Sequence, residues 1–334
     1  MYHTLFVPLD GSSEAERPLL TVALLADACA ETARVLLVRS AAAADAAEGE
    51  RAGPAHVRAM EDAEDYLRAI AAPLTQTGIE VSAVTSYGDA AETILTQAIS
   101  ESASVITMAT HGRWGMDRLL HGSLAEVVVA GATQPVLLFG PEMRAEVPIR
   151  RMLIPLDGGP FTAAVLPEAG RFAQSFGIQR IDLLAILPPQ TVHVDDLEGA
   201  PPAWALEKMG VTSVGNSIYA LDARQTLVQD RLQELEHALG YWSDWLHDSA
   251  AEVRVHARYE LGQGSTAASI LKAASELESD MIVMRTHARR GIARALTGSV
   301  ADEVVRTSSL PVLLYTTRMI EALASGSAIV NVSI

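Results

Sequence analysis

The sequence predicts an α/β protein built from two repeats, each a parallel sheet covered by helices on both faces. Short apolar runs bounded by turn residues alternate with helical stretches, which favours parallel strands joined by right-handed crossovers. The chain also repeats itself: residues 105–139 align without a gap on 281–315, and nearly half of the aligned positions are identical. A length of 334 residues, of which 49% are apolar, suits two domains with substantial cores.

The first repeat contains five predicted strands and four predicted helices. The strands are apolar runs at 4–9, 35–38, 80–86, 105–109 and 135–139. The helices between them are predicted at 13–30, 56–72, 89–101 and 123–132. Ser13 and Glu16 have the spacing of a capping box, which indicates the start of the first helix.

The second repeat begins at "MLIPLDG" (152–158), which corresponds to "LFVPLDG" (5–11). It is longer than the first because it carries an insertion around 188–250. Pro141 and Pro148 mark a linker between the repeats. We therefore predict three regions: a first domain at 1–142, a second at 149–316 and a C-terminal tail at 317–334.

Charge and cysteine content exclude several classes of protein. The 25 basic and 41 acidic residues give a net charge of −16, which disfavours nucleic acid as a partner. No run approaches the roughly 18 apolar residues that span a bilayer, and the N-terminal sequence lacks the pattern of a signal peptide. A single cysteine, Cys29, fits a helix core position and excludes an intramolecular disulfide. We expect a cytoplasmic protein without membrane contact.

A glycine-rich segment, "ATHGRWGMDRLLHGS" (109–123), follows the fourth strand. In an open parallel sheet, ligands bind beyond the carboxyl ends of the strands, where the strand order reverses. Gly112 and Gly122 would let backbone N–H groups approach a ligand closely. Ser123 opens the next helix, whose N-terminus favours an anion, most commonly phosphate. The segment is therefore a candidate phosphate-binding loop.

Structural explanations for the same residues stay open. Ser123 and Glu126 have capping-box spacing, and Ser299 and Asp302 have a similar arrangement in the second repeat. Asp10, at the end of the first strand, suits either a helix cap or a hydrogen bond to a ribose hydroxyl.

Other chemical motifs are absent from the sequence. There is no G-x-x-x-x-G-K-[ST] loop, and no G-x-G-x-x-G follows the first strand. No His, Cys and carboxylate cluster has the spacing of metal ligands, and no nucleophile is paired with a base. We therefore predict neither catalytic residues nor a protein-held metal.

The residues at these positions resemble the universal stress protein family in its tandem two-domain form. The family pattern G-x2-G-x9-G-[ST] aligns with Ala109, Gly112, Gly122 and Ser123, with alanine in place of the first glycine. The early run "VPLDGS" (7–12) is also similar to the family. The resemblance spans about 1–140 and 150–316. It implies a five-stranded parallel sandwich of the adenine-nucleotide α-hydrolase type, which is Rossmann-like, and ATP binding in many members.

The resemblance also implies a nucleotide site in each repeat. In the first, it assigns contacts with ribose, adenine and phosphates to Pro8, Asp10, Val38 (through its backbone), Met108, Ala109, His111, Gly112, Gly122, Ser123 and Leu124. In the second, the matching positions are Asp157, Ala185, Met284, His287, Gly298, Ser299 and Val300. Ala109 replaces the first family glycine, a change that we expect ATP binding to tolerate.

The second repeat departs further from the family pattern. Arg285 and Ala288 replace both earlier glycines of the loop. The arginine is bulky where ribose would lie, and the alanine adds a Cβ where backbone N–H groups would meet phosphate. Nearby arginines could nevertheless bind phosphate well. This site is a degenerate site, a different anion site or a second ATP site.

The resemblance implies an ATP-binding module of stress response or signalling, with ATP mainly in the first repeat and Mg²⁺ bound through the phosphates. The alternatives are a slow ATPase, or a structural or partner-binding stress protein without nucleotide. The two "PVLL" runs, 135–138 and 311–314, are expected to pair and join the repeats as an intramolecular pseudo-dimer. A homodimer of the whole chain and a protein partner stay open.

Overall fold

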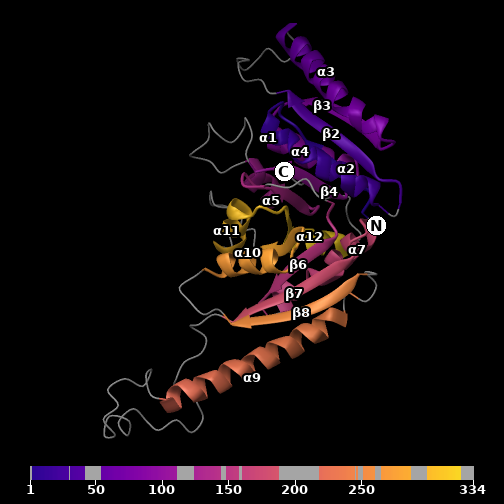
Figure 1. Cartoon of the computed structure of the whole chain (residues 1–334). Coiled ribbons are helices and arrows are strands. Elements are labelled where there is room, and N and C mark those ends of the chain that lie inside the picture. Colours follow the sequence, from indigo (N-terminus) through magenta and orange to yellow (C-terminus); the bar gives the residue numbers. More distant parts are fainter. Residues whose placement is uncertain are drawn as a thin grey trace.

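The computed structural model describes residues 2–29, 31–41, 54–110, 124–143, 148–157, 160–187, 218–244, 246, 251–259, 265–286 and 299–324. Its described residues form two halves that follow the two repeats. We call residues up to 143 the first half and those from 148 the second half. The strands of both halves join in one sheet (Figure 1).

The first half contains five strands and five helices among its described residues. The strands are β1 (Thr4–Pro8), β2 (Arg34–Ala41), β3 (Glu80–Tyr87), β4 (Val105–Ala109) and β5 (Val136–Phe139). The helices are α1 (Ser13–Glu16), α2 (Leu19–Asp27), α3 (Pro54–Gln76), α4 (Ala90–Ser100) and α5 (Leu124–Gly131).

The second half repeats this order with additional helices. Its described strands are β6 (Arg151–Leu156), β7 (Arg180–Leu187), β8 (Glu252–Tyr259), β9 (Met281–Thr286) and β10 (Val312–Thr316). Its described helices are α6 (Pro160–Ala163), α7 (Leu166–Ser175), α9 (Ile218–Ser243), α10 (Thr266–Glu276), α11 (Ser299–Thr307) and α12 (Thr317–Ala324). Helix α9 lies within the predicted insertion, and α12 begins the predicted tail.

The sheet confirms the predicted α/β fold with parallel strands. The strand order is β3-β2-β1-β4-β5-β10-β9-β6-β7-β8. Within each half all pairs are parallel. The chain runs outward from β1 to β3 and then returns to the other side of β1 with β4. The order therefore reverses between β1 and β4, and in the second half between β6 and β9.

The two halves meet where β5 and β10 pair antiparallel. Val136 faces Leu314 in this ladder, and Leu138 faces Val312. These residues belong to the two "PVLL" runs, whose pairing the family resemblance implies. The ladder gives each half's last strand a partner on its otherwise open edge. Whether the halves behave as one pseudo-dimer in solution stays a prediction.

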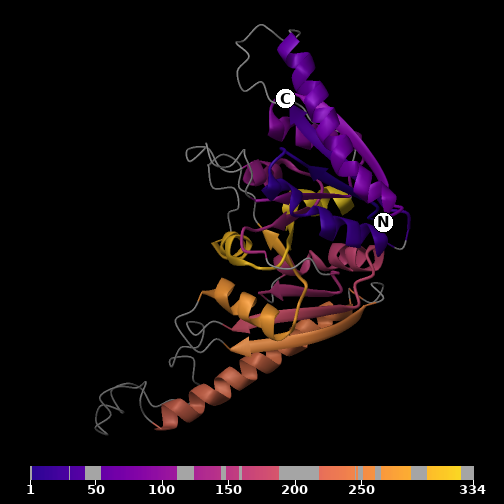
Figure 2. The same cartoon turned by 45° about the horizontal axis from the view of Figure 1, so that its top comes forward.

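The sheet is covered on both faces, which explains the apolar character of its strands. Along β1, Leu5 and Val7 point into one core, whereas Phe6 points into the core on the other face. In both views α3 lies along β3 at one end of the molecule and α9 lies along β8 at the other (Figures 1 and 2).

One predicted helix is wrong in detail. The segment 13–30 forms two helices, α1 and α2, separated by a turn at Arg17 and Pro18. Proline cannot donate the backbone hydrogen bond that a continuous helix needs at this position. The cap also differs from the prediction: Ser12, not Ser13, caps α1 by accepting a hydrogen bond from the N–H of Ala15.

Candidate functional site

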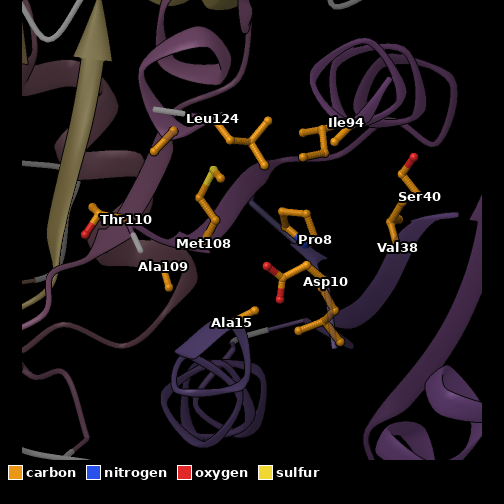
Figure 3. Close-up of a pocket in the computed structure, with 13 residues that line it drawn as sticks. Pro8, Asp10, Ala15, Val38, Ser40, Ile94, Met108, Ala109, Thr110 and Leu124 are labelled. Atoms are coloured by element: carbon orange, nitrogen blue, oxygen red, sulfur yellow. The ribbon is translucent and has the colours of Figure 1, made fainter. Parts of the chain in front are cut away.

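A pocket of about 560 Å³, including its open mouth, lies at the carboxyl ends of β1, β2 and β4, at the point where the strand order reverses. This is the position at which open α/β sheets bind ligands. Helices α1, α4 and α5 complete its walls. The pocket is lined by Pro8, Leu9, Asp10, Ala15, Val38, Ser40, Ala90, Ile94, Met108, Ala109, Thr110, Leu124 and Ala125 (Figure 3).

The pocket has two ends, which are formed by different elements. At the β2–α4 end, Val38 and Ser40 come from the strand, and Ala90 and Ile94 come from the helix. We call this the β2 end. The opposite end is formed by the last residue of β4, the following Thr110 and the first turn of α5. Figure 3 shows Val38 and Ser40 on one side of the pocket and the β4 residues on the other.

Asp10 is the acidic side chain of the lining, and it lies between the two ends (Figure 3). Its Oδ1 atom accepts hydrogen bonds from the backbone N–H of Ser12 at 2.9 Å and from the Ser12 hydroxyl at 2.5 Å. Among the described residues nothing donates a hydrogen bond to Oδ2. Asp10 therefore shapes the turn before α1 while keeping one carboxylate oxygen available to a ligand.

A chain of contacting side chains begins at the turn that carries Asp10. Gly11 has a φ of +82°, and a Cβ at this position would lie 3.2 Å from the guanidinium of Arg39. That guanidinium stacks over the ring of Tyr66, 4.5 Å from its centroid. The Tyr66 hydroxyl donates a hydrogen bond to Glu16 at 2.8 Å. Burial and this hydrogen bond raise the pKa of Tyr66, so the phenol stays protonated.

Helix α5 contributes its N-terminus to the β4 end. Leu124 and Ala125, its first two residues, line the pocket. The free N–H groups of a helix start favour an anion. The predicted contacts His111, Gly112, Gly122 and Ser123 lie outside the described residues, whereas the other six predicted residues of the first half all line this pocket.

In the second half, strand register changes one assignment. Pro8 pairs with Val38 between β1 and β2, and the corresponding Pro155 pairs with Leu184 between β6 and β7. Leu184 is therefore the counterpart of Val38, and it belongs to the core on the same sheet face. Ala185, predicted for this role, lies one residue further along and belongs to the opposite core. The sequence alignment was off by one because the connection from β6 to β7 is one residue shorter than that from β1 to β2.

Three positions of the second half carry larger side chains than the corresponding lining positions of the first half. Thr162 stands where α1 has Ala15, and its hydroxyl hydrogen-bonds Oδ1 of Asp157 at 2.5 Å. Ile186 stands where β2 has Ser40. Arg285 stands where β4 has Ala109, and it donates a hydrogen bond to the hydroxyl of Thr317 on α12 at 3.2 Å. Burial lowers the pKa of Arg285.

The remaining predicted residues of the second half are only partly described. Met284, on β9, is largely buried, and Val300, on α11, packs against the same core. Ser299 is the first residue of α11. The carboxylate of Asp302 pairs with Arg306 at 3.0 Å. His287 and Gly298 lie outside the described residues.

Comparison with known proteins decides the family. The model of the universal stress protein family matches residues 1–140 and 148–316. The chain belongs to the universal stress protein family. The two matches correspond to the two halves of the structure.

Relatives of this universal stress protein include single-repeat and longer chains. A universal stress protein of Thermus aquaticus is 34% identical over 138 residues, which are 41% of this chain and 98% of that one. One of Mycolicibacterium smegmatis is 24% identical over 220 residues, 66% of this chain and 64% of its own length. A solved universal stress protein from Archaeoglobus fulgidus shares the fold, with a TM-score of 0.61, 18% identity and coverage of 94% of this chain and 96% of that one.

Several lining residues of this universal stress protein were missed from the sequence. They are Leu9, Ala15, Ser40, Ala90, Ile94, Thr110 and Ala125. Two signals could have found some of them. Ser40 follows Val38 by two residues, so both lie on one face of a strand. Ala90 and Ile94 are four residues apart, so both lie on one face of a helix.

No described helix is both long and apolar enough to cross a membrane. The described residues contain no group of three or more His, Cys, Asp and Glu side chains that could hold a metal ion.

Proposed function

We propose that this universal stress protein binds ATP in the pocket of its first half and acts as a nucleotide-dependent module in a stress response. The observation that supports this most is the meeting of Pro8, Asp10, Val38, Met108, Ala109 and Leu124 around one pocket at the switch point of the sheet. These residues come from β1 and the turn after it, from β2, from β4 and from α5, and the family resemblance assigns all of them to nucleotide contact.

The chemistry of the pocket fits a nucleotide. The β2 end is mainly apolar and suits a flat base. The free oxygen of Asp10 can accept a hydrogen bond from a ribose hydroxyl. The phosphates would then lie toward the start of α5 and the predicted glycine loop.

Mg²⁺ would enter the site with ATP, held mainly by phosphate oxygens and water, as is usual for this ion. When bound, it would neutralise part of the phosphate charge. In this proposal, the predicted His111 donates a hydrogen bond to a phosphate oxygen and does not act as a general base. The protein is then a binding module, and any hydrolysis of ATP is slow.

The second half is less suited to ATP in this proposal. The side chain of Arg285 occupies the position at which the first half has only the methyl group of Ala109. We therefore assign ATP mainly to the first half.

A blocking substitution tests the site. Ala109→Arg copies the second half's residue into the first-half pocket and should weaken ATP binding at least about tenfold, measured by calorimetry with Mg²⁺. The matched control is Val127→Arg, which adds the same side chain on the 42% exposed outer face of α5. It should bind ATP like the wild type. Unchanged affinity in a folded Ala109→Arg protein would contradict the proposed site.

A further inference from the structure

Among the described residues, the β2 end of the pocket contains one polar side chain, that of Ser40. The other polar side chains of the lining lie elsewhere: Asp10 is central, and Thr110 is at the β4 end. The other described lining residues at this end are Val38, Ala90 and Ile94, all apolar. Of the described side chains, the Ser40 hydroxyl is therefore the one that can distinguish the polar edge of one base from another.

The direction of this hydroxyl's proton is fixed by the protein. Ser40 is 9% exposed, and its Oγ donates a hydrogen bond to the backbone carbonyl of Gly88 at 2.8 Å. A serine hydroxyl has one proton to donate and two lone pairs that accept. With the proton committed to Gly88, the oxygen can only accept a hydrogen bond from a ligand.

Turning the hydroxyl toward a ligand would be costly. Among the described residues, the Gly88 carbonyl receives no other hydrogen bond, and losing this one would leave it unpaired in a partly buried turn. That turn precedes Asp89, which caps α4 through the N–H groups of Ala91 and Glu92. The Ser40–Gly88 bond thus joins β2 to the start of the helix that forms the pocket wall.

We propose that Ser40 is a specificity-determining residue that makes the site select a 6-amino purine over a 6-oxo purine. An exocyclic amine can donate to the Ser40 oxygen, whereas a 6-oxo group would place an acceptor against an acceptor. The inference rests on the proposed function and deepens it, because it names a residue that selects the base. In the second half the corresponding residue is Ile186, which has no polar group for this contact.

The test compares ATP with ITP, which carries a 6-oxo group, in the wild type and in three variants by calorimetry with Mg²⁺. The wild type should prefer ATP by at least about tenfold, the value of one well-made hydrogen bond. Ser40→Ala should reduce this ratio about tenfold, and Ser40→Thr, which keeps the hydroxyl, should restore it. The matched control is Ser86→Ala, on the neighbouring strand opposite Ser40 and outside the lining, which should leave the ratio unchanged.

The ratio of ATP affinity to ITP affinity separates a loss of base specificity from structural damage. A variant that merely loosens the turn would weaken both nucleotides equally and preserve the ratio. If the wild type binds ATP but Ser40→Ala keeps the wild-type ratio, the role of Ser40 is wrong and the proposed function stands. If the wild type binds neither nucleotide, the proposed function itself is wrong.

Discussion

Tyr2 joins the two halves through a buried polar contact, and its removal should weaken the whole structure. Its hydroxyl donates a hydrogen bond to Oε2 of Glu168 on α7 at 3.1 Å and lies 3.2 Å from the hydroxyl of Tyr315 on β10. Tyr2 is 5% exposed and Glu168 is 4% exposed, so neither group is solvated by bulk water. Tyr2→Phe removes this hydroxyl and keeps the ring that packs on Phe172.

The expected cost follows from these contacts. A hydrogen bond to a charged group contributes about 1.5–3 kcal/mol, and a neutral one about 0.5–1.5 kcal/mol. We therefore expect Tyr2→Phe to lose about 2–4 kcal/mol of unfolding free energy and Tyr315→Phe about 0.5–1.5 kcal/mol. The bond of Glu168 to Arg171 is not included, because the Arg171 side chain is 56% exposed and solvent screens it.

Urea unfolding monitored by circular dichroism measures these losses. Tyr241→Phe is the control, since Tyr241 is 62% exposed and the change should stay within about 0.5 kcal/mol of the wild type. A Tyr2→Phe protein as stable as this control would refute the reasoning, because it would show that the buried contact between the halves contributes nothing.

Three further predictions concern packing, pH and the glycine loop. Gly140→Ala should lower the free energy of unfolding, measured in urea, by about 1–3 kcal/mol, because a Cβ there would lie 2.6 Å from a backbone carbonyl of α11. The control is Gly240→Ala, whose Cβ would meet nothing within 4 Å, and it should be neutral or slightly stabilising. Burial raises the pKa of Tyr2 and Tyr315, so the folded protein keeps protons that the unfolded chain releases near pH 10. The free energy of unfolding should therefore fall as the pH rises above about 10, and it should fall less in Tyr2→Phe. Gly122→Val should abolish most ATP binding, and calorimetry showing wild-type affinity would contradict the phosphate-loop interpretation.

The strands and their sheet were predictable because the spacing of apolar residues and the composition of each run indicate strands directly. A run such as Val105–Ala109 is apolar on both faces, and its bounds were predicted without error. The family resemblance, applied to the two repeats, then predicted that their last strands pair, as β5 and β10 do. The break at Pro18 was also readable, since proline rarely continues a helix.

The candidate site was predictable in part, for a physical reason. Residues at strand ends, such as Asp10 and Met108, are placed by topology alone, because parallel strands end at one edge. Ser40 and Ile94 are placed by how far β2 extends and how α4 packs, which depend on tertiary contacts that a single sequence does not reveal. The assignment of Ala185 as the counterpart of Val38 was wrong for the same reason, because the register between β6 and β7 depends on strand pairing and not on spacing along the chain.

The central claim is tested most directly by counting the ATP molecules that one chain of the wild type binds in a calorimetric titration with Mg²⁺. We predict one saturable site per chain, which is lost in Ala109→Arg and kept in Val127→Arg. No saturable binding by the wild type would contradict the proposed function. Two sites per chain would contradict the assignment of ATP mainly to the first half.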